Sequence, residues 1–253
     1  MKLTSQLKNE DETLDTFYSG RIHVLQKKKG YRFSVDAPLL ADFIRTRHTD
    51  ELLELGTGAG IIPLLLSIKP FKHITALEVQ KNLADMARRN VKLNCLEEKI
   101  SVIEEDLRRY KPEKKFDIIF SNPPYIKKKG GHLSPSVEKS IAKHELKCNI
   151  NDIIKKTHEL LKKEGRAYFI YPSKRKTDLM QAIDEHGLHV NTLKFVCPHQ
   201  ETPPNLLLVK CAFSSGTKVI LPPFILYNEK GEYTTEANEI FLGRTNAAHY
   251  QEP

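Results

Sequence analysis

The chain has 253 residues, a formal net charge of +8 and four cysteines. Its length allows one large domain or two small ones, and its longest apolar stretch, residues 61–68, is too short to cross a bilayer. The N-terminus lacks a signal-peptide pattern, and no cysteine or histidine spacing is typical of a metal site. We therefore expect a cytoplasmic protein with no metal and no membrane partner, whose positive charge favours a polyanionic ligand.

Two groups of lysines stand near residues that suit nucleic acid. The first is followed by aromatic and arginine side chains, a combination that can contact phosphates and stack on bases. The second follows the loop after residue 121 and precedes two glycines. Lysines are often only a solvated surface, but this placement favours contact with nucleic acid by Lys27, Lys28, Lys29, Tyr31, Arg32, Lys127, Lys128 and Lys129.

Residues 37–44 have the apolar periodicity of a helix, with Pro38 in its first turn. Ser34 and Asp36 are both candidates for the N-cap of this helix. A helix that precedes the first strand of a nucleotide-binding α/β fold lies against the ligand, so Ser34 is equally a candidate for cofactor binding.

Residues 51–66 indicate a strand, a glycine turn and a helix. The turn has the spacing G-x-G-x-G, which fits neither the dinucleotide fingerprint G-x-G-x-x-G nor a P-loop. S-adenosylmethionine is the remaining common ligand of such a turn, because glycines let a ligand approach the backbone closely. We expect its methionine end to lie against the strand end and turn, at Glu54, Gly56, Thr57, Gly58 and Gly60.

Two further strands end in acidic residues. The strand at residues 74–79 contains Glu78, 20 residues after Gly58, where a carboxylate can accept hydrogen bonds from both ribose hydroxyls. The strand at residues 100–106 ends in Asp106, which can accept from an adenine amino group. Either acid alone fits a solvated loop position, but their order after the glycine turn favours a cofactor site.

The loop after the strand at residues 116–121 begins with Asn122-Pro123-Pro124-Tyr125. Asn-Pro and Pro-Pro are also ordinary turn formers. At the carboxyl end of a strand in an open α/β sheet, however, the Asn122 oxygen and the Pro123 carbonyl can both accept from one planar amino group, and Tyr125 can stack on the ring that carries it. This arrangement turns the nitrogen lone pair towards an electrophile. We expect all four residues to form the catalytic loop, with Asn122 also touching the cofactor.

The remaining elements complete an α/β pattern. Helices are expected at residues 82–94, 153–161 and 177–186, the second closed by Gly165, and strands at 166–171, 192–196, 205–212 and, in strand-like form, 220–227. Five alternating strands and a closing pair match the seven-stranded Rossmann-like sheet of class I methyltransferases, whose last strand is antiparallel. We expect an N-terminal extension at 1–30, a methyltransferase domain at 31–215 and a C-terminal extension at 216–253.

Several segments together resemble one family. They are residues 31–41, 122–125, 141–145, 220–227 and 231–234. With them the chain closely resembles the bacterial tRNA (adenine-N6) methyltransferases that modify adenine 37 of a valine tRNA, over roughly residues 14–242. One departure is Lys143, which stands where the family has arginine, so a bidentate phosphate contact at that position is in doubt.

The resemblance implies a cofactor, a substrate and a mechanism. S-adenosylmethionine is the methyl donor and tRNA the substrate, and the target adenine leaves its loop to enter the pocket. Tyr125 then stacks on the base while Asn122 and the Pro123 carbonyl accept from its N6 amino group. No separate strong base is required, since the proton can leave after the nitrogen becomes cationic.

Three alternatives stay open from the sequence. A protein glutamine N5-methyltransferase uses the same loop on an amide nitrogen, but its N-terminal helical domain has no counterpart in the 30 residues before Tyr31. A ribosomal-RNA adenine or guanine amino methyltransferase and a DNA adenine methyltransferase share the loop, although the DNA enzymes usually carry a target-recognition domain. A catalytically idle RNA-binding protein needs neither the glycine turn nor Asn122.

Overall fold

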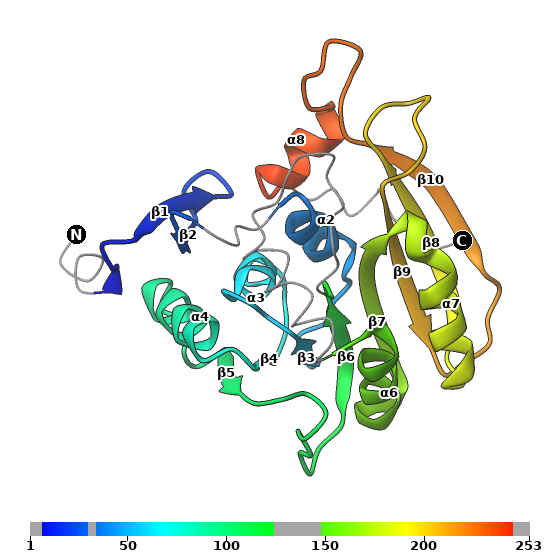
Figure 1. Cartoon of the computed structure of the whole chain (residues 1–253), viewed down its shortest axis with the longest axis horizontal. Helices are drawn as coiled ribbons and strands as arrows, with labels where there is room; N and C mark the ends of the chain where they lie inside the picture. The colour runs from blue at the N-terminus through cyan, green and yellow to red at the C-terminus, as the bar shows by residue number, and fades with distance from the viewer. Residues whose placement is uncertain (1–6, 30–33, 124–147, 245–253) are drawn as a thin grey trace.

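The computed structural model of the chain describes residues 7–29, 34–123 and 148–244. Within these ranges the chain forms an eight-stranded sheet with helices packed on it and a separate two-stranded hairpin (Figure 1). The strands of the sheet are β3 (Glu51–Leu55), β4 (His73–Glu78), β5 (Ile100–Glu104), β6 (Phe116–Ser121), β7 (Leu161–Pro172), β8 (His189–Cys197), β9 (Leu206–Ala212) and β10 (Val219–Ile225).

The strands lie in the order β10-β8-β9-β7-β6-β3-β4-β5. All neighbouring pairs are parallel except those of β9, which runs antiparallel to both β7 and β8. The chain adds β4 and β5 on one side of β3 and then returns to place β6 on the other side. The boundary between β3 and β6 is therefore the switch point of the sheet, where open α/β sheets bind their ligands.

Strands β3 to β9 confirm the predicted class I methyltransferase sheet with its antiparallel last strand, and β10 adds an eighth strand beside β8. This strand contains Pro222 and Pro223, and its pairing with β8 is irregular between Leu221 and Phe224. Proline has no N–H to donate, so a sheet accepts it at an edge strand. The edge position explains how a proline-containing segment can still extend the sheet.

Helices cover both faces of the sheet. On one face, the helices share a hydrophobic core that includes Leu52, Ile118 and Phe120 of the central strands. On the other face, the core includes Leu53, Leu55 and Ile119. The helices of the first face are α2 (Asp36–Phe43), α3 (Ile61–Leu66), α4 (Lys81–Leu93) and α8 (Thr235–Phe241), and those of the second are α6 (Ile150–Leu160) and α7 (Lys176–Glu185), which follows a short 3-10 turn at Ser173–Arg175.

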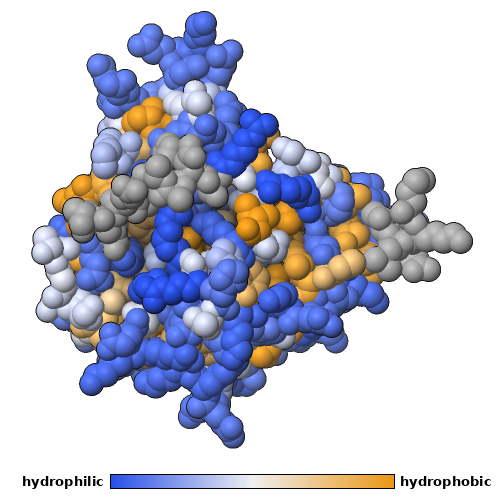
Figure 2. Space-filling model, turned by 180° about the vertical axis from the view of Figure 1, so that it is seen from behind, coloured by the Kyte–Doolittle hydropathy of each residue, from blue (hydrophilic) through white to orange (hydrophobic). Residues whose placement is uncertain are grey.

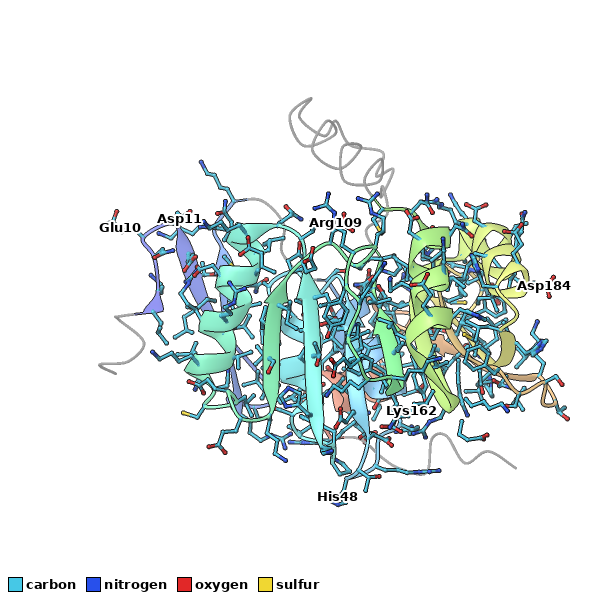
Figure 3. The ribbon with its side chains drawn as sticks, turned by 90° about the horizontal axis from the view of Figure 1, so that it is seen from below. Glu10, Asp11, His48, Arg109, Lys162 and Asp184 are labelled. Carbon is cyan, nitrogen blue, oxygen red and sulfur yellow. The ribbon has the colours of Figure 1, made fainter. Side chains whose placement is uncertain are left out.

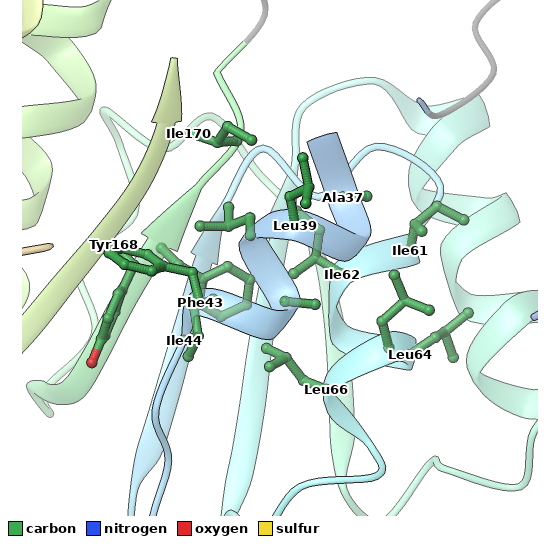
Figure 4. Close-up of a cluster of buried hydrophobic side chains, with 14 of the residues drawn as sticks. Ala37, Leu39, Phe43, Ile44, Ile61, Ile62, Leu64, Leu66, Tyr168 and Ile170 are labelled. Carbon is green, nitrogen blue, oxygen red and sulfur yellow. The ribbon is translucent and has the colours of Figure 1, made fainter. Parts of the chain in front are cut away.

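Helix α2 is buried along its whole length, because it lies between the sheet and other helices (Figure 4). The ring of Phe43 meets the ring of Tyr168 on β7 edge to face, with centroids 5.7 Å apart. Edge-to-face contact suits the quadrupoles of two aromatic rings. Phe43 is the last residue of α2, so this contact holds the C-terminal end of the helix against β7.

The N-terminal hairpin consists of β1 (Glu12–Phe17) and β2 (Ile22–Lys27), joined by a turn in which Tyr18, Ser19 and Gly20 all have positive φ. It lies next to α4 at the outer side of the molecule (Figure 1). At the other end of the chain, β10 pairs with β8, and α8 packs against α2. The division into extensions and domain stays a prediction.

Two local expectations are wrong. The N-cap of α2 is Val35, and Asp36 is already the first helical residue, so neither Ser34 nor Asp36 takes the capping position. Helix α6 begins with a capping box at Asn149 and ends at Leu160, where the chain passes directly into β7. Gly165 thus lies within β7, where an added Cβ would stand 2.7 Å from Leu161 Cδ1, so close packing rather than helix termination requires the glycine.

Figure 2 shows a face on which hydrophilic residues dominate and apolar ones form separate areas. Among the residues that the structure describes, no helix combines the length and the apolar character needed to span a membrane.

Candidate cofactor and catalytic site

The two loops of the candidate site start side by side at the switch point. Glu54 of β3 pairs with Phe120 of β6, so Gly56 and Asn122 each lie two residues beyond this pair at the carboxyl edge. One residue earlier, the buried Ser121 hydroxyl donates a 2.6 Å hydrogen bond to the Leu55 carbonyl. The structure therefore brings together the glycine turn and the start of the Asn-Pro-Pro-Tyr loop.

The glycine turn has a backbone that only glycine adopts easily. Gly56, Gly58 and Gly60 have φ values of 81°, 58° and 82°. The N–H groups of Gly56 and Thr57 both donate to the Leu77 carbonyl of β4, at 3.0 and 2.8 Å. A Cβ built on Gly56 would meet nothing within 4 Å, so open space adjoins the turn at this residue.

Glu78 ends β4 with a fixed and largely buried carboxylate. Its Oε2 accepts from the Gly58 N–H at 2.8 Å and its Oε1 accepts from the Gln80 N–H at 2.9 Å. Each carboxylate oxygen can accept a second hydrogen bond. The Glu78 carboxylate is therefore held against the glycine turn through both of its oxygens.

Glu54 lies fully buried beside the same turn. Burial, with a smaller contribution from the nearby Glu78 carboxylate, raises the pKa of Glu54 from 4.5 to about 8, although the neighbouring Thr57 side chain opposes this in part. The Thr57 hydroxyl nevertheless falls short of hydrogen-bond geometry, and neither Thr57 Oγ1 nor Glu54 Oε2 has a hydrogen-bond partner among the described residues. Two buried polar atoms thus remain available at the edge where a ligand would lie.

Asp106 follows β5 and is held by an arginine. The Arg108 Nε donates to Asp106 Oδ1 at 3.0 Å, and this partner lowers the pKa of the Asp106 carboxyl group. The carboxylate is therefore ionised at neutral pH. An adenine amino group that bonds to Asp106 has to share it with Arg108.

Asn122 is the first residue of the candidate catalytic loop. Its Oδ1 is buried and has no hydrogen-bond partner among the described residues, and Pro123 beside it is buried. An unpaired buried oxygen is costly, so a structure that keeps one usually has a use for it. The described residues end here, and the other predicted members of the loop and its basic neighbours, Pro124, Tyr125, Lys127, Lys128 and Lys129, lie outside them.

The N-terminal basic group is only partly free to meet a ligand. Lys27 forms ion pairs with Asp11 at 2.7 Å and Glu12 at 3.4 Å, whereas Lys28 and Lys29 are exposed. Figure 3 shows Asp11 on the same side of the molecule as Arg109, which follows the carboxyl end of β5. His48, which precedes β3, and Lys162, at the start of β7, lie on the opposite side. The lysine end of the hairpin therefore faces the same side as the carboxyl edge. Tyr31 and Arg32 lie outside the described residues, and Ser34 lies two residues before the first residue of α2.

Sequence reasoning missed three residues of this region. Val79 follows Glu78 directly and is an apolar side chain that is 51% exposed. Ser121 ties the two loops together, and Asn90 of α4 donates to the Ala59 carbonyl inside the glycine turn. Val79 could have been found from the sequence, because it directly follows the acidic residue that ends a strand. Ser121 and Asn90 could not, because their partners are distant in the chain.

Across the described residues, no three histidine, cysteine, aspartate or glutamate side chains are grouped as metal ligands.

The chain is similar to curated proteins and to solved structures. A curated relative from Vibrio campbellii, named tRNA1(Val) (adenine(37)-N6)-methyltransferase, is 27% identical over 186 residues, which cover 73% of this chain and 77% of the relative. A relative of the same name from Parabacteroides distasonis is 24% identical over 88% of this chain and 94% of its own length. Among solved structures, an Agrobacterium tumefaciens protein described as a predicted O-methyltransferase superposes with a TM-score of 0.66 at 20% identity, covering 83% of this chain and 97% of that one.

The model of the family described as "Methyltransferase small domain" matches residues 32–196. These residues include the glycine turn, Glu78, Asp106, the Asn-Pro-Pro-Tyr loop and all strands of the sheet up to β8, where the match ends one residue before the strand does. The chain therefore belongs to the methyltransferase small-domain family.

Proposed function

We propose that this protein transfers a methyl group from S-adenosylmethionine to N6 of adenine 37 in the anticodon loop of a tRNA. The observation that carries the proposal is the buried Oδ1 of Asn122, which has no hydrogen-bond partner among the described residues and lies one residue after the Ser121–Leu55 bond that joins the two loops. The curated relatives support the choice of substrate by their names. A tRNA substrate also implies that the protein works in the cytoplasm.

The residues present fit the cofactor. Open space next to Gly56 leaves room for its amino-acid end, Glu54 and Thr57 offer unsatisfied polar atoms, and Glu78 offers acceptors for a ribose diol. Val79 gives an apolar surface for an adenine ring, and Asp106 an acceptor at the end of the next strand. When bound, the cofactor supplies an electrophilic methyl carbon on a sulfonium centre.

The chain's own residues prepare the acceptor nitrogen. Asn122 Oδ1 accepts one hydrogen of the adenine N6 amino group, and the Pro123 carbonyl accepts the other. With both hydrogens bonded in the ring plane, the nitrogen lone pair points out of that plane. Tyr125 stacks on the base, which contributes about 1–3 kcal/mol in known base–aromatic contacts. Catalysis then rests on positioning and electrostatics, and the proton leaves after the nitrogen has gained its fourth bond.

RNA binding is assigned to the basic side chains near this edge. Lys28 and Lys29 are exposed at the end of the hairpin that faces it, and further lysines follow the catalytic loop in the sequence. Each phosphate contact releases counterions, so affinity should fall by roughly one log unit per log unit of salt for each contact. A salt-independent affinity would argue against nucleic acid as the substrate.

The test is methyl transfer from labelled S-adenosylmethionine to unmodified valine tRNA, followed by nucleoside analysis. We expect N6-methyladenosine in this tRNA and none in a matched transcript in which guanosine replaces adenine 37. Label that appears instead in ribosomal RNA or at a protein glutamine would support the role of the catalytic loop but contradict tRNA as the substrate. Label in no acceptor would contradict the proposed activity.

A further inference from the structure

Helix α4 makes a hydrogen bond to the glycine turn through the buried side chain of Asn90. Asn90 is 0% exposed, and its Nδ2 donates to the Ala59 carbonyl at 2.9 Å. The same amide pairs with β2 of the hairpin, because its Oδ1 accepts from the Leu25 N–H at 2.6 Å and its Nδ2 donates to the Leu25 carbonyl at 3.1 Å. One carboxamide therefore joins three elements: α4, the hairpin and the turn.

Asn94, one helical turn further along, makes a similar pair but does not reach the turn. Its Oδ1 accepts from the His23 N–H at 2.9 Å, and its Nδ2 donates to the His23 carbonyl at 2.7 Å. Side chains four residues apart lie on one helix face, and alternate residues of a strand expose their backbone groups to the same side. The two asparagines thus act as a substitute strand edge for β2, and only Asn90 also contacts the glycine turn.

The contact with Ala59 fixes one peptide group of the turn at both ends. The peptide plane between Ala59 and Gly60 has its carbonyl bound by Asn90, and its N–H donates to the Thr57 carbonyl at 3.0 Å. A peptide group is planar, so these two bonds set its orientation. Flanking glycines would otherwise allow that plane to rotate at little cost.

Close packing restrains the same point of the turn. A Cβ built on Gly60 would stand 3.1 Å from the Cβ of Ala87, which lies three residues before Asn90 on α4. Gly58, on the other side of Ala59, is held by Glu78 at 2.8 Å. Two polar side chains therefore hold the turn on either side of the Gly58–Ala59 bond, Glu78 at the Gly58 N–H and Asn90 at the Ala59 carbonyl.

We propose that Asn90 is a positioning residue for the methyl donor, whose amide holds the glycine turn in its ligand-binding shape and couples that shape to the N-terminal hairpin. This inference rests on the proposed function, because it takes the turn as the cofactor site. A flexible turn loses conformational freedom when it binds, so a restraint present before binding increases affinity. The hairpin carries Lys28 and Lys29 next to its bonded strand, so the same amide links the basic surface with the cofactor site.

Two matched substitutions test the role. Asn90→Asp and Asn94→Asp each keep the oxygen that accepts from β2 and replace the donating NH₂ group, but only Asn90→Asp faces the Ala59 carbonyl. At pH 8, we expect the calorimetric Kd of S-adenosylhomocysteine to rise about tenfold or more in Asn90→Asp and less than about twofold in Asn94→Asp. The KM for S-adenosylmethionine should follow the Kd, with kcat at saturation changed less than about twofold.

Equal weakening in both variants would show that Asn90 only docks the hairpin, and unchanged binding in Asn90→Asp would overturn the proposal outright. If Asn90→Asp does not fold, amide hydrogen exchange of the wild-type protein tests the positioning role instead. We expect S-adenosylhomocysteine to slow exchange at the Leu25 and Gly60 amides and to leave the His23 amide, bound by Asn94, unchanged. No added protection at Leu25 would contradict the coupling.

A third variant separates this inference from the proposed function. Val79 is 51% exposed beside Glu78, so Val79→Glu should leave the fold intact but obstruct an adenine ring at this edge. If Val79→Glu binds S-adenosylhomocysteine with wild-type affinity, the cofactor does not bind at this edge, and both proposals lose their basis. Weakened binding in Val79→Glu with normal binding in Asn90→Asp would overturn the positioning role alone.

Discussion

The hydroxyl of Ser121 donates a 2.6 Å hydrogen bond to the backbone carbonyl of Leu55 across the boundary between β6 and β3. Leu55 is the last residue before the glycine turn, and Ser121 is the last residue before Asn122. The bond therefore sets the distance between the loop assigned to the methyl donor and the loop assigned to its acceptor. Methyl transfer requires these two groups in line, so a bond remote from the reacting atoms can affect the rate.

Replacement of Ser121 by alanine should lower kcat about threefold to tenfold, with little change in cofactor Kd, because the loops lose their direct tie while each keeps its own shape. It should also reduce the free energy of unfolding by about 1–2 kcal/mol for the lost buried hydrogen bond. Thr157→Val is the matched control, since its buried hydroxyl donates to the Ile153 carbonyl at 2.9 Å on α6, outside the site. Equal kcat values for the two variants would show that Ser121 serves stability only.

Asn122→Ala should reduce kcat by about 10²–10³, the range seen when a single preorganised polar group is removed from other active sites. Cofactor Kd should stay within about twofold, because Glu78 and the glycine turn are untouched. Asn122→Asp keeps an acceptor oxygen and should retain more activity than the alanine variant. Single-turnover assays with valine tRNA measure the first effect and calorimetry the second, and normal turnover in Asn122→Ala would exclude the proposed role.

Glu54 should make the free protein less stable as the pH rises. Burial and the Glu78 carboxylate raise the pKa of Glu54 from 4.5 to about 8. Between these values the folded protein holds a proton that the unfolded chain has released, so the free energy of unfolding falls with rising pH, by roughly a few kcal/mol in total. Most of this loss is expected between about pH 5 and pH 8.

Urea unfolding of the wild type and Glu54→Gln at pH 5.5, 7 and 8.5 measures this contribution. The variant has no ionisable group at this position, so its stability should fall less across the range. Burial lowers the pKa of His73, which acts in the opposite direction but is common to both proteins. Glu12 and Glu51, with pKa values lowered to about 2, lose their contribution only at lower pH. Parallel pH profiles would mean that Glu54 is already ionised in the folded protein.

Gly60→Ala should destabilise the protein more than Gly187→Ala. Both glycines have positive φ, 82° and 65°, so alanine is strained at either position by about 1 kcal/mol. Only at Gly60 does the new Cβ also approach a neighbour, Ala87 Cβ at 3.1 Å, which should add about 1–3 kcal/mol and weaken cofactor binding. Equal melting temperatures for the two variants would show that α4 yields to the added methyl group.

The sequence by itself determined the local elements and the motifs at their ends. The glycine spacing, the acidic ends of two strands and the loop after β6 are local patterns, and the alternation of helix and strand follows from side-chain periodicity. The class I methyltransferase sheet was predicted from this alternation and is confirmed, with β10 as an additional edge strand. Alternation limits the topology because parallel strands require crossover connections.

Contacts distant in the sequence were decided only by the tertiary structure. A local sequence pattern does not show which atoms face each other across the core. It therefore could not predict the hydrogen bonds Ser121–Leu55 and Asn90–Ala59 or the ion pair of Lys27 with Asp11. The same limit explains Gly165, which looked like a helix terminus but is required by packing against Leu161. Short-range geometry selects the elements, whereas burial and hydrogen bonding between them decide where each side chain acts.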